Sequence, residues 1–372
     1  EGEDFSELGE YMFPESVLNF LMKPLKVLNK IYEIAKIEKI SLESFLIKKV
    51  FPEYKNFDEN TKTVFLIYIM DNWLRFNENQ DLIECMKNIE LIQVGENCYK
   101  KASDLFDPRI ETLNMLFDDQ QSMFPQGNFR SDEWLDILRE IGLKDRISQD
   151  DAIQCAKQIQ KNLNESMSPI GLLFCKARLL LKVLVDEYGD YFFSDSFNSS
   201  ISKIRFVPAL GPMNEHLSLY LFSEVALPKD SHFIFTVQPI LAECLVPPMN
   251  NWSKLKIKTP PEIKHTLSHI FNLTRECNVL DNWKFKDPPS KVFQSIYGFM
   301  DENWSKFTLS EQKELRNSTL IPIDGQMVKA SRLFFRLKGE SLAPYLYEVP
   351  RIFGAFDRLF KLLGTAPTPT MS

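Results

Sequence analysis

Two histidines form the pattern in this chain that comes nearest to a metal site. His265 and His269 lie four residues apart in a stretch with helical spacing, so a helix would place both imidazoles on one face. Cys277 follows shortly after them. Zinc sites use four ligands at short spacing, and no HExxH pattern occurs here. We interpret the pair as an ordinary helix face, with a metal site as the alternative.

Other groups that could do chemistry are isolated. His216 and His232 are interpreted as hydrogen-bonded structural histidines rather than general bases. No GxSxG, GxxxxGK[ST] or GxGxxG pattern is present. The pairs Asp118-Asp119 and Asp150-Asp151 would point apart on a helix, and the second suits a helix N-terminus. The sequence therefore predicts no catalytic, cofactor-binding or metal-ligating residue, and a protein that is not an enzyme.

Two further groups of residues leave alternatives open. The main basic cluster alternates with apolar residues beside Trp252, which favours an edge strand guarded by charge over a site for an anionic partner. Its members are Lys254, Lys256, Lys258 and Lys264. The aromatic residues Phe192, Phe193 and Phe197 fit equally well in the core or against a partner.

Composition limits the class of protein. The 372 residues are enough for two to three domains, and 44% hydrophobic and 26% charged residues with 30 Phe are typical of an ordered globular chain. A net charge of -7 argues against nucleic acid as a partner. The most apolar stretch, 171–185, is interrupted by Lys176, Arg178 and Lys182, so no membrane segment is expected.

Cysteine usage and the chain start indicate a compartment and a context. Six cysteines are scattered without a close pair: Cys85, Cys98, Cys155, Cys175, Cys244 and Cys277. This distribution favours free buried thiols in a reducing compartment over disulfides. The chain opens on Glu1 with no Met and no leader pattern, so we expect an internal slice of a larger polypeptide.

The hydrophobic periodicity predicts mostly helices. They are expected at 14–37 with a kink at Pro24, and at 41–50, 58–76, 110–117, 131–142, 148–163, 168–188, 261–273, 289–304, 308–315 and 353–364. Strands are expected at 204–207 and 232–237, and 194–200 is expected to be a loop. Thr308 and Glu311 form a predicted capping box.

One phrase occurs twice. Residues 91–106 and 320–334 each read as a short strand, a Gly turn, a second strand, then Lys-Ala-Ser and Leu-Phe. Similar helices precede both copies, so the chain holds two related units about 230 residues apart. The fold is predicted to be α+β, predominantly helical with short antiparallel hairpins, in two associated halves at 1–198 and 199–372.

Four phrases together resemble the sacsin family of giant proteins, plant relatives included. They are 101–108, 124–125 with 142–143, 225–241, and 343–350. The resemblance implies a very large cytoplasmic, chaperone-linked protein whose large repeats follow an Hsp90-like ATPase module. Its active modules are not matched: Asp151-Ala152 lacks the Asn of the ATP site, and DxGxG and His-Pro-Asp are absent. The resemblance thus transfers scaffold and no catalytic residue.

Three functions remain open. In the favoured one the chain is a non-catalytic scaffold segment that supports ATPase modules and contacts client, cytoskeletal or chaperone proteins and neighbouring domains of its own polypeptide. In the second, an arginine such as Arg109 or Arg205 completes in trans the ATP site of an adjacent Hsp90-like module. The third is a helical adaptor unrelated to this family.

Overall fold

The computed structural model describes residues 41–95, 98–166, 168–186, 193–214, 216–275, 280–281, 283, 285–337 and 343–368. Contacts between residues group the chain into two compact units, Glu1–Ser148 and Gln149–Ser372. The sequence predicts a division between residues 198 and 199, because the two halves of the sequence are related. That division stays a prediction. The expected helices over 14–37 lie outside the described residues.

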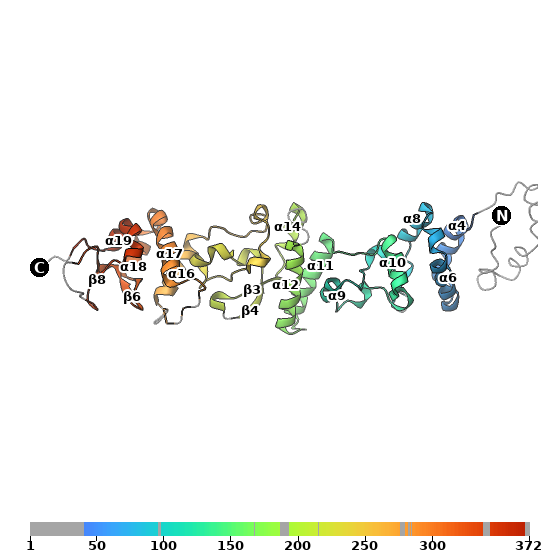
Figure 1. Ribbon diagram of the computed structural model, residues 1–372, viewed down its shortest axis with the longest axis horizontal. Coiled ribbons are helices and arrows are strands. Elements are labelled where there is room, and N and C mark those ends of the chain that lie inside the picture. Colours follow the sequence, from blue (N-terminus) through green and yellow to red (C-terminus); the bar gives the residue numbers. More distant parts are fainter. Residues whose placement is uncertain are drawn as a thin grey trace, which may run out of the picture. The chain divides into compact units, whose positions relative to one another are not determined.

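The first unit is helical apart from one hairpin. Its helices are α4 Leu42–Phe45, the π-helix η1 Leu46–Val50, α5 Phe51–Glu53, η2 Tyr54–Asn56, α6 Glu59–Asp71, α7 Trp73–Phe76, α8 Gln80–Asn88, η3 Ala102–Asp104, α9 Glu111–Leu116, η4 Gln121–Met123, η5 Gly127–Arg130 and α10 Asp132–Glu140. The hairpin is β1 Ile92–Gly95 with β2 Cys98–Lys100 (Figure 1). The side chains of Asp58, Asn79 and Ser131 accept a backbone N–H in the first turn of α6, α8 and α10, which fixes where these helices begin.

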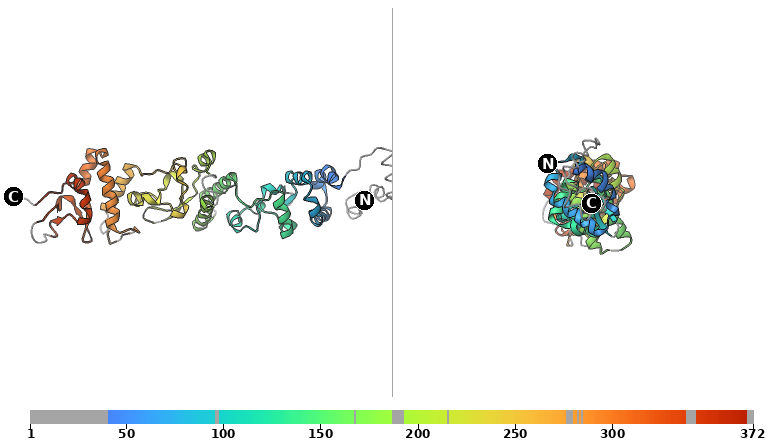
Figure 2. Two further views of the ribbon diagram at one scale, coloured as in Figure 1. Left: turned by 45° about the horizontal axis from the view of Figure 1, so that its top comes forward. Right: turned by 90° about the vertical axis from the view of Figure 1, so that its right-hand side faces the viewer.

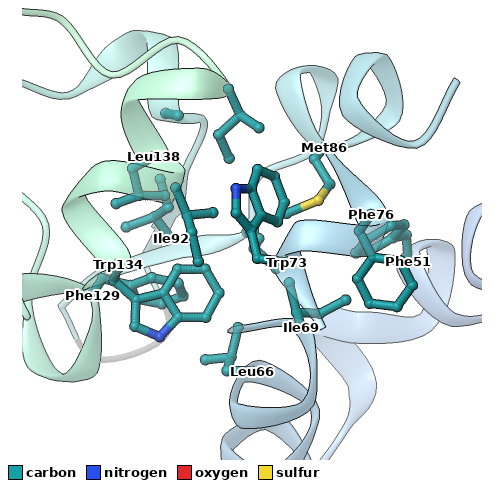
Figure 3. Packing of buried hydrophobic residues seen from close by; sticks show 14 of the residues in the cluster. Phe51, Leu66, Ile69, Trp73, Phe76, Met86, Ile92, Phe129, Trp134 and Leu138 are labelled. Atoms are coloured by element: carbon teal, nitrogen blue, oxygen red, sulfur yellow. The ribbon is translucent and has the colours of Figure 1, made fainter. Parts of the chain in front are cut away.

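The core of this unit gathers apolar side chains from α6, α7, α8, β1 and α10 (Figure 3). The indole of Trp73 lies between the α6 side and the α10 side of the cluster, and its Nε1 donates to Glu140 Oε2 at 3.0 Å. A buried indole nitrogen needs such an acceptor, because an unpaired polar group in the core is costly. The bond therefore joins two helices that are distant in sequence.

The second unit contains the remaining elements. Its helices are α11 Gln149–Asn164, α12 Ile170–Asp186, α14 Asp195–Ile201, η6 Pro212–Asn214, η7 Phe222–Glu224, η8 Pro228–Asp230, α15 Ser231–Ile234, η9 Glu243–Leu245, η10 Met249–Asn251, α16 Ile263–Arg275, α17 Pro289–Asn303, η11 Trp304–Lys306, α18 Leu309–Asn317, η12 Ala330–Arg332, η13 Arg351–Phe356 and α19 Asp357–Leu363. Its strands are β3 Val207–Leu210, β4 Leu217–Tyr220, β5 Thr319–Ile323, β6 Gln326–Lys329, β7 Leu333–Phe334 and β8 Tyr347–Glu348.

All described strands pair in two-stranded sheets. The pairs β1–β2 and β5–β6 are the two predicted antiparallel hairpins, β3–β4 is a further antiparallel hairpin, and β7–β8 is a parallel pair. Helices α17, α18 and α19 lie beside the β5–β6 hairpin in the orange-to-red part of the ribbon in both sets of views (Figures 1 and 2). Their shared core is built around Tyr297, whose ring meets those of Phe353 and Phe360 edge-on.

The structure confirms the repeated phrase and extends it. In the first copy, α6, α8, β1, β2 and η3 follow one another, and α17, α18, β5, β6 and η12 do so in the same order. After each 3-10 turn comes a buried leucine, Leu105 or Leu333. The next residue then forms a parallel bridge, Phe106 with Lys144 and Phe334 with Ala366. The two copies therefore continue into the helices α10 and α19, which the sequence had not connected.

A third copy lies between these two. Helices α12 and α14, the β3–β4 hairpin and η7 have the same order, and Val225-Ala226 takes the place of Leu-Phe. Ala226 N donates to Pro239 O, as Phe106 N donates to Met123 O. The sequence did not reveal this copy because its side chains have diverged, whereas the shared feature is a pattern of backbone hydrogen bonds that many residues can adopt.

Each copy ends at a residue with positive φ. Gly142 and Gly364 have φ of 109° and 107°, and Lys256 has φ of 64°. The next backbone N–H folds back in each case: those of Leu143, Thr365 and Ile257 donate to Leu138, Phe360 and Trp252. Positive φ suits glycine because it has no Cβ, which explains the two glycines.

Three local predictions are wrong. Residues 194–200 are not a loop: Ser194 accepts from Phe197 N and caps α14, which buries Phe197 and Ile201 one turn apart. Residues 232–237 are not a strand, since the 3-10 turn that Pro228 opens continues directly into α15. The expected strand at 204–207 instead runs Val207–Leu210 and includes Pro208, which is tolerated because this sheet has only two strands.

None of the helices in the described part of the chain combines the length and the apolar character that a bilayer crossing requires.

Candidate functional site

His269 lies in a buried polar network between α15 and α16. Its Nε2 is 3.1 Å from His232 O and its Nδ1 is 2.7 Å from Thr236 Oγ1. The ring therefore donates through Nε2 and accepts through Nδ1, which is the neutral tautomer. Burial lowers the pKa of His269 to about 3, although the backbone hydrogen bond to His232 raises it. A neutral imidazole held this way fastens the 231–237 turn to α16.

His232 lies between a hydroxyl and a carboxylate. Its Nδ1 is 3.0 Å from Ser295 Oγ, and its Nε2 is 2.9 Å from Asp287 Oδ2. Hydrogen bonds from Lys291 and then His232 lower the pKa of Asp287. A hydroxyl, imidazole and carboxylate in a row is the arrangement that activates a serine nucleophile. Here, however, Ser295 lies in the middle of α17 and also donates to Lys291 O, so the row serves to join α15 to α17.

The predicted metal alternative receives no support from these contacts. His265 lies one turn before His269, and its nearest acidic partner is Glu262 at 4.0 Å. In the described residues no three His, Cys, Asp or Glu side chains come together as a ligand set. Cys277 lies outside the described residues. His216 lies in the β3–β4 turn, where its carbonyl accepts from Gly211 N.

Both arginines singled out from the sequence are engaged by their own chain. Arg109 donates to the fully buried Asp107 and, through Nη1, to Asp136 at 2.8 Å. Arg205 pairs with Glu224 and donates to Leu219 O at 3.3 Å. A role in trans at an ATP site would require these pairs to open, and it stays a prediction.

Asp107 is the most deeply buried carboxylate of this cluster. It accepts from Arg109 and from Arg139 Nε, the latter at 2.6 Å. Burial raises the pKa of Asp107, but the hydrogen bonds from both arginines outweigh it and leave that pKa below its usual range. The network links the residues after the first hairpin to α10.

The basic cluster does not form an edge strand. Residues 249–258 are a 3-10 helix and turns, and Lys256 has positive φ, which no strand residue adopts. Lys254 pairs with Asp195, while Lys258 and Lys264 both pair with Glu262. These carboxylates neutralise much of the cluster.

The other residues singled out from the sequence lie in the core, in a helix terminus or at the surface. Phe193 and Phe197 are buried edge-on against each other, so they belong to the core, and Phe192 lies outside the described residues. Asp150 and Asp151 lie in the first turn of α11, as expected from the helix dipole. The described cysteines form no disulfide, but only Cys155 is buried. The expectation of buried thiols is wrong for the exposed ones, Cys98, Cys175 and Cys244.

Several large apolar side chains are exposed. They include Ile67, Leu74, Met115, Leu172, Met249, Leu309, Tyr345 and Ile352. Leu74 and Leu309 are the most open, at 86% and 85%. Ile67 and Leu74 lie seven residues apart on α6 and α7, two turns along one helical side.

The first unit also contains a cavity of about 280 Å³ beside α6. Tyr54, Leu66 and Phe129 supply apolar walls, and the polar lining is Glu59, Lys62, Thr63, Gln93, Gln126 and Asn128 with the backbone of Gly95 and Gly127. Sequence reasoning missed this site. The available signal was Lys62, which falls on the buried face of α6 with Phe65, Leu66 and Ile69.

Comparison with known proteins places these features in context. The chain is 28% identical to human sacsin over 364 residues, an alignment that spans 90% of this chain. This chain is similar in sequence to part of sacsin. It covers 8% of the length of sacsin, so the match concerns a small part of that protein. No family model matches the chain, and no solved structure matches it. The family resemblance seen in the four sequence phrases is thereby supported along most of the chain.

Proposed function

We propose that this chain is a non-catalytic scaffold segment of a sacsin-type giant protein in the cytoplasm. In this role it holds chaperone-linked ATPase modules apart and presents surface to client, cytoskeletal or chaperone proteins. The observation that carries the proposal is the threefold repetition of one packed module in a sacsin-like chain. Stacked or repeated packing units add interaction surface without requiring a reactive centre.

The use of polar side chains supports this role. The histidines and arginines with the best placement for chemistry, His232, His269, Arg109 and Arg205, are each held in hydrogen bonds that join elements of their own unit. Such bonds favour a single rigid arrangement, because leaving any partner unpaired costs free energy. Rigidity is what a spacer between modules needs.

Exposed apolar side chains support the interaction part of the proposal. The side chains of Leu74 and Leu309 are mostly exposed to water. This exposure of apolar surface is energetically unfavourable unless a partner covers it part of the time. Unfolded clients offer apolar segments that would gain from this contact. The net charge of -7 disfavours nucleic acid as the partner.

Suppression of aggregation tests client binding. The purified chain is mixed with a chemically denatured globular enzyme on dilution, and light scattering is followed. We expect lower scattering with the chain present, and a weaker effect for Leu74→Ser combined with Leu309→Ser. The matched control is Asp71→Ser with Lys313→Ser, since Asp71 ends α6 just before α7 and Lys313 lies on α18 with Leu309. No binding of unfolded clients, and none of filament proteins in cosedimentation, would remove this part of the proposal.

A second experiment tests the scaffold against a contribution in trans to ATP hydrolysis. An Hsp90-like ATPase domain joined to this chain is assayed with Arg109→Ala and with Arg205→Ala. The scaffold proposal expects unchanged turnover for both variants, after circular dichroism has shown that each is folded. A loss of turnover with intact folding would favour the trans role instead.

A further inference from the structure

Lys62 brings a buried positive charge to the wall of the cavity beside α6. Its side chain is 9% exposed, and its Nζ donates to Tyr99 Oη at 2.7 Å and to Glu59 Oε1 at 3.0 Å. The ammonium carries three N–H donors, so these two bonds leave it capacity for one more acceptor. Nζ also lies 4.9 Å from the centre of the Tyr99 ring.

The local charge balance favours an anionic occupant. Glu59 neutralises Lys62 in formal count, but its side chain is 68% exposed and water screens its charge. The Lys62 side chain is mostly covered, so its charge is screened less than that of Glu59. The other lining groups are neutral amides and a hydroxyl, which add hydrogen bonds without adding charge.

The copy that contains α17 bridges the corresponding place with a side chain. There Gln294 on α17 takes the position of Leu66 on α6, and its Nε2 donates to Ile352 O at 2.9 Å in the loop that corresponds to 126–129. Phe356 adds its ring against Tyr297. In the first copy Leu66 has no amide to make this bridge, and the space is left as a cavity. The bridging amide is therefore a difference between these two copies of a shared framework.

We propose that the cavity beside Lys62 binds a carboxylate of a partner polypeptide, supplied by a free C-terminus or an acidic side chain. This rests on the proposed role in binding proteins. The carboxylate takes the open donor of Lys62, while Tyr54, Leu66 and Phe129 contact the adjoining apolar side chain. A phosphate dianion fits less well, because the lining holds one cation beside the carboxylate of Glu59. The volume admits one or two residues of a chain.

Short peptides test the proposal on the whole chain. The probes are acetyl-Ala-Ala-Ala-Phe with a free C-terminal carboxylate, the same peptide as its amide, and amidated acetyl-Ala-Ala-Asp-Phe. Amide NMR shifts are followed, with those of Gly95 and Gly127 as reporters of the cavity. We expect saturable shifts with either carboxylate-bearing peptide and none with the uncharged amide. The two carboxylate arms distinguish a C-terminus from an acidic side chain.

Variants then identify the residue responsible. Lys62→Met keeps the length of the side chain and should weaken binding about tenfold or more, as expected for one charge-assisted hydrogen bond. Lys62→Arg should retain binding, which guards against a folding defect in the first variant. Glu59→Gln should strengthen binding, because it removes a competing carboxylate. Lys48→Met is the matched control, since Lys48 lines a different hollow in the same unit.

Two outcomes would overturn the assignment of this cavity as a carboxylate site. One is equal response to the free acid and the amide, and the other is binding that Lys62→Met leaves unchanged in a folded protein. Suppression of aggregation by the unmodified chain is measured alongside. If that activity is present while the peptides do not bind, the pocket assignment fails and the interaction role stands; if both are absent, the proposed function fails as well.

Discussion

Gly142 and Gly364 end equivalent helices with nearly the same backbone conformation, at φ of 109° and 107°. A Cβ at either position would meet no atom closer than 3.9 Å, so space is not the constraint. The constraint is the positive φ itself, a backbone conformation that residues with a Cβ rarely adopt.

Gly142→Ala and Gly364→Ala are therefore expected to lower the free energy of unfolding by about 1–2 kcal/mol each. Urea denaturation followed by circular dichroism measures this. Gly171→Ala is the matched control: it lies in α12, has room for a Cβ and no positive φ, and should stabilise the helix by up to about 1 kcal/mol. Equal effects at the three positions would contradict the backbone argument.

At Lys256 the opposite change, from a residue with a side chain to glycine, can be tested. It occupies the same position in the middle copy with φ of 64°, where a side chain is strained. Lys256→Gly should raise the free energy of unfolding by up to about 1 kcal/mol, since relief of strain exceeds the added freedom of the unfolded chain. Lys256→Ala removes the charge and keeps the strain, so it should give no gain. A gain with alanine as well would point to charge instead.

His269 predicts a pH dependence of stability. Its pKa falls from 6.5 in the unfolded chain to about 3 in the fold, so the unfolded state binds the proton more readily. The stabilisation is complete above pH 6.5 and is lost as pH falls toward 3, at up to about 1.4 kcal/mol per pH unit. Urea midpoints between pH 7.5 and 5 measure this slope, above the range where carboxyl groups titrate.

His269→Gln should remove that slope and lower stability at pH 7, with the difference from the unmodified chain shrinking as pH falls. His265→Gln on the same helix is the control, because its side chain is partly exposed and lies outside the network. If the slope persists without His269, another group is responsible.

Asp107 should be sensitive to loss of its charge. Asp107→Asn leaves Arg109 and Arg139 without their buried carboxylate, and we expect a loss of about 3 kcal/mol at pH 7. Asp136→Asn affects a 69% exposed partner of Arg109 and should cost less than about 1 kcal/mol. Denaturation midpoints compare the two. Because the folded pKa of Asp107 is depressed, its contribution is lost only as pH falls below the usual aspartate range.

Thiol accessibility checks the exposure of the cysteines. Brief treatment of the folded chain with iodoacetamide should label Cys98, Cys175 and Cys244 and leave Cys155 unmodified. Burial raises the pKa of Cys85, so its thiolate is scarce and its labelling should be slow. Peptide mass mapping reads each site. Rapid labelling of Cys155 would show that α11 opens readily.

Local chemistry in the sequence determined much of this protein. Capping residues such as Ser131 and Thr308, the closing glycines and the 3.6-residue spacing of apolar residues specified most helices, because these signals act within one or two turns. The twice-used phrase specified two hairpins, and the four longer phrases specified the sacsin resemblance.

Tertiary structure decided the rest. The third copy became visible only through backbone hydrogen bonds such as that of Ala226 with Pro239, which leave no fixed residue type behind. Asp107 bonds to Arg139, His269 to Thr236 and Lys62 to Tyr99, at separations of 32, 33 and 37 residues, so no spacing rule could name these partners. Whether a charged group is buried, paired or open to a ligand depends on the surfaces that packing brings against it, and only the folded chain fixes those.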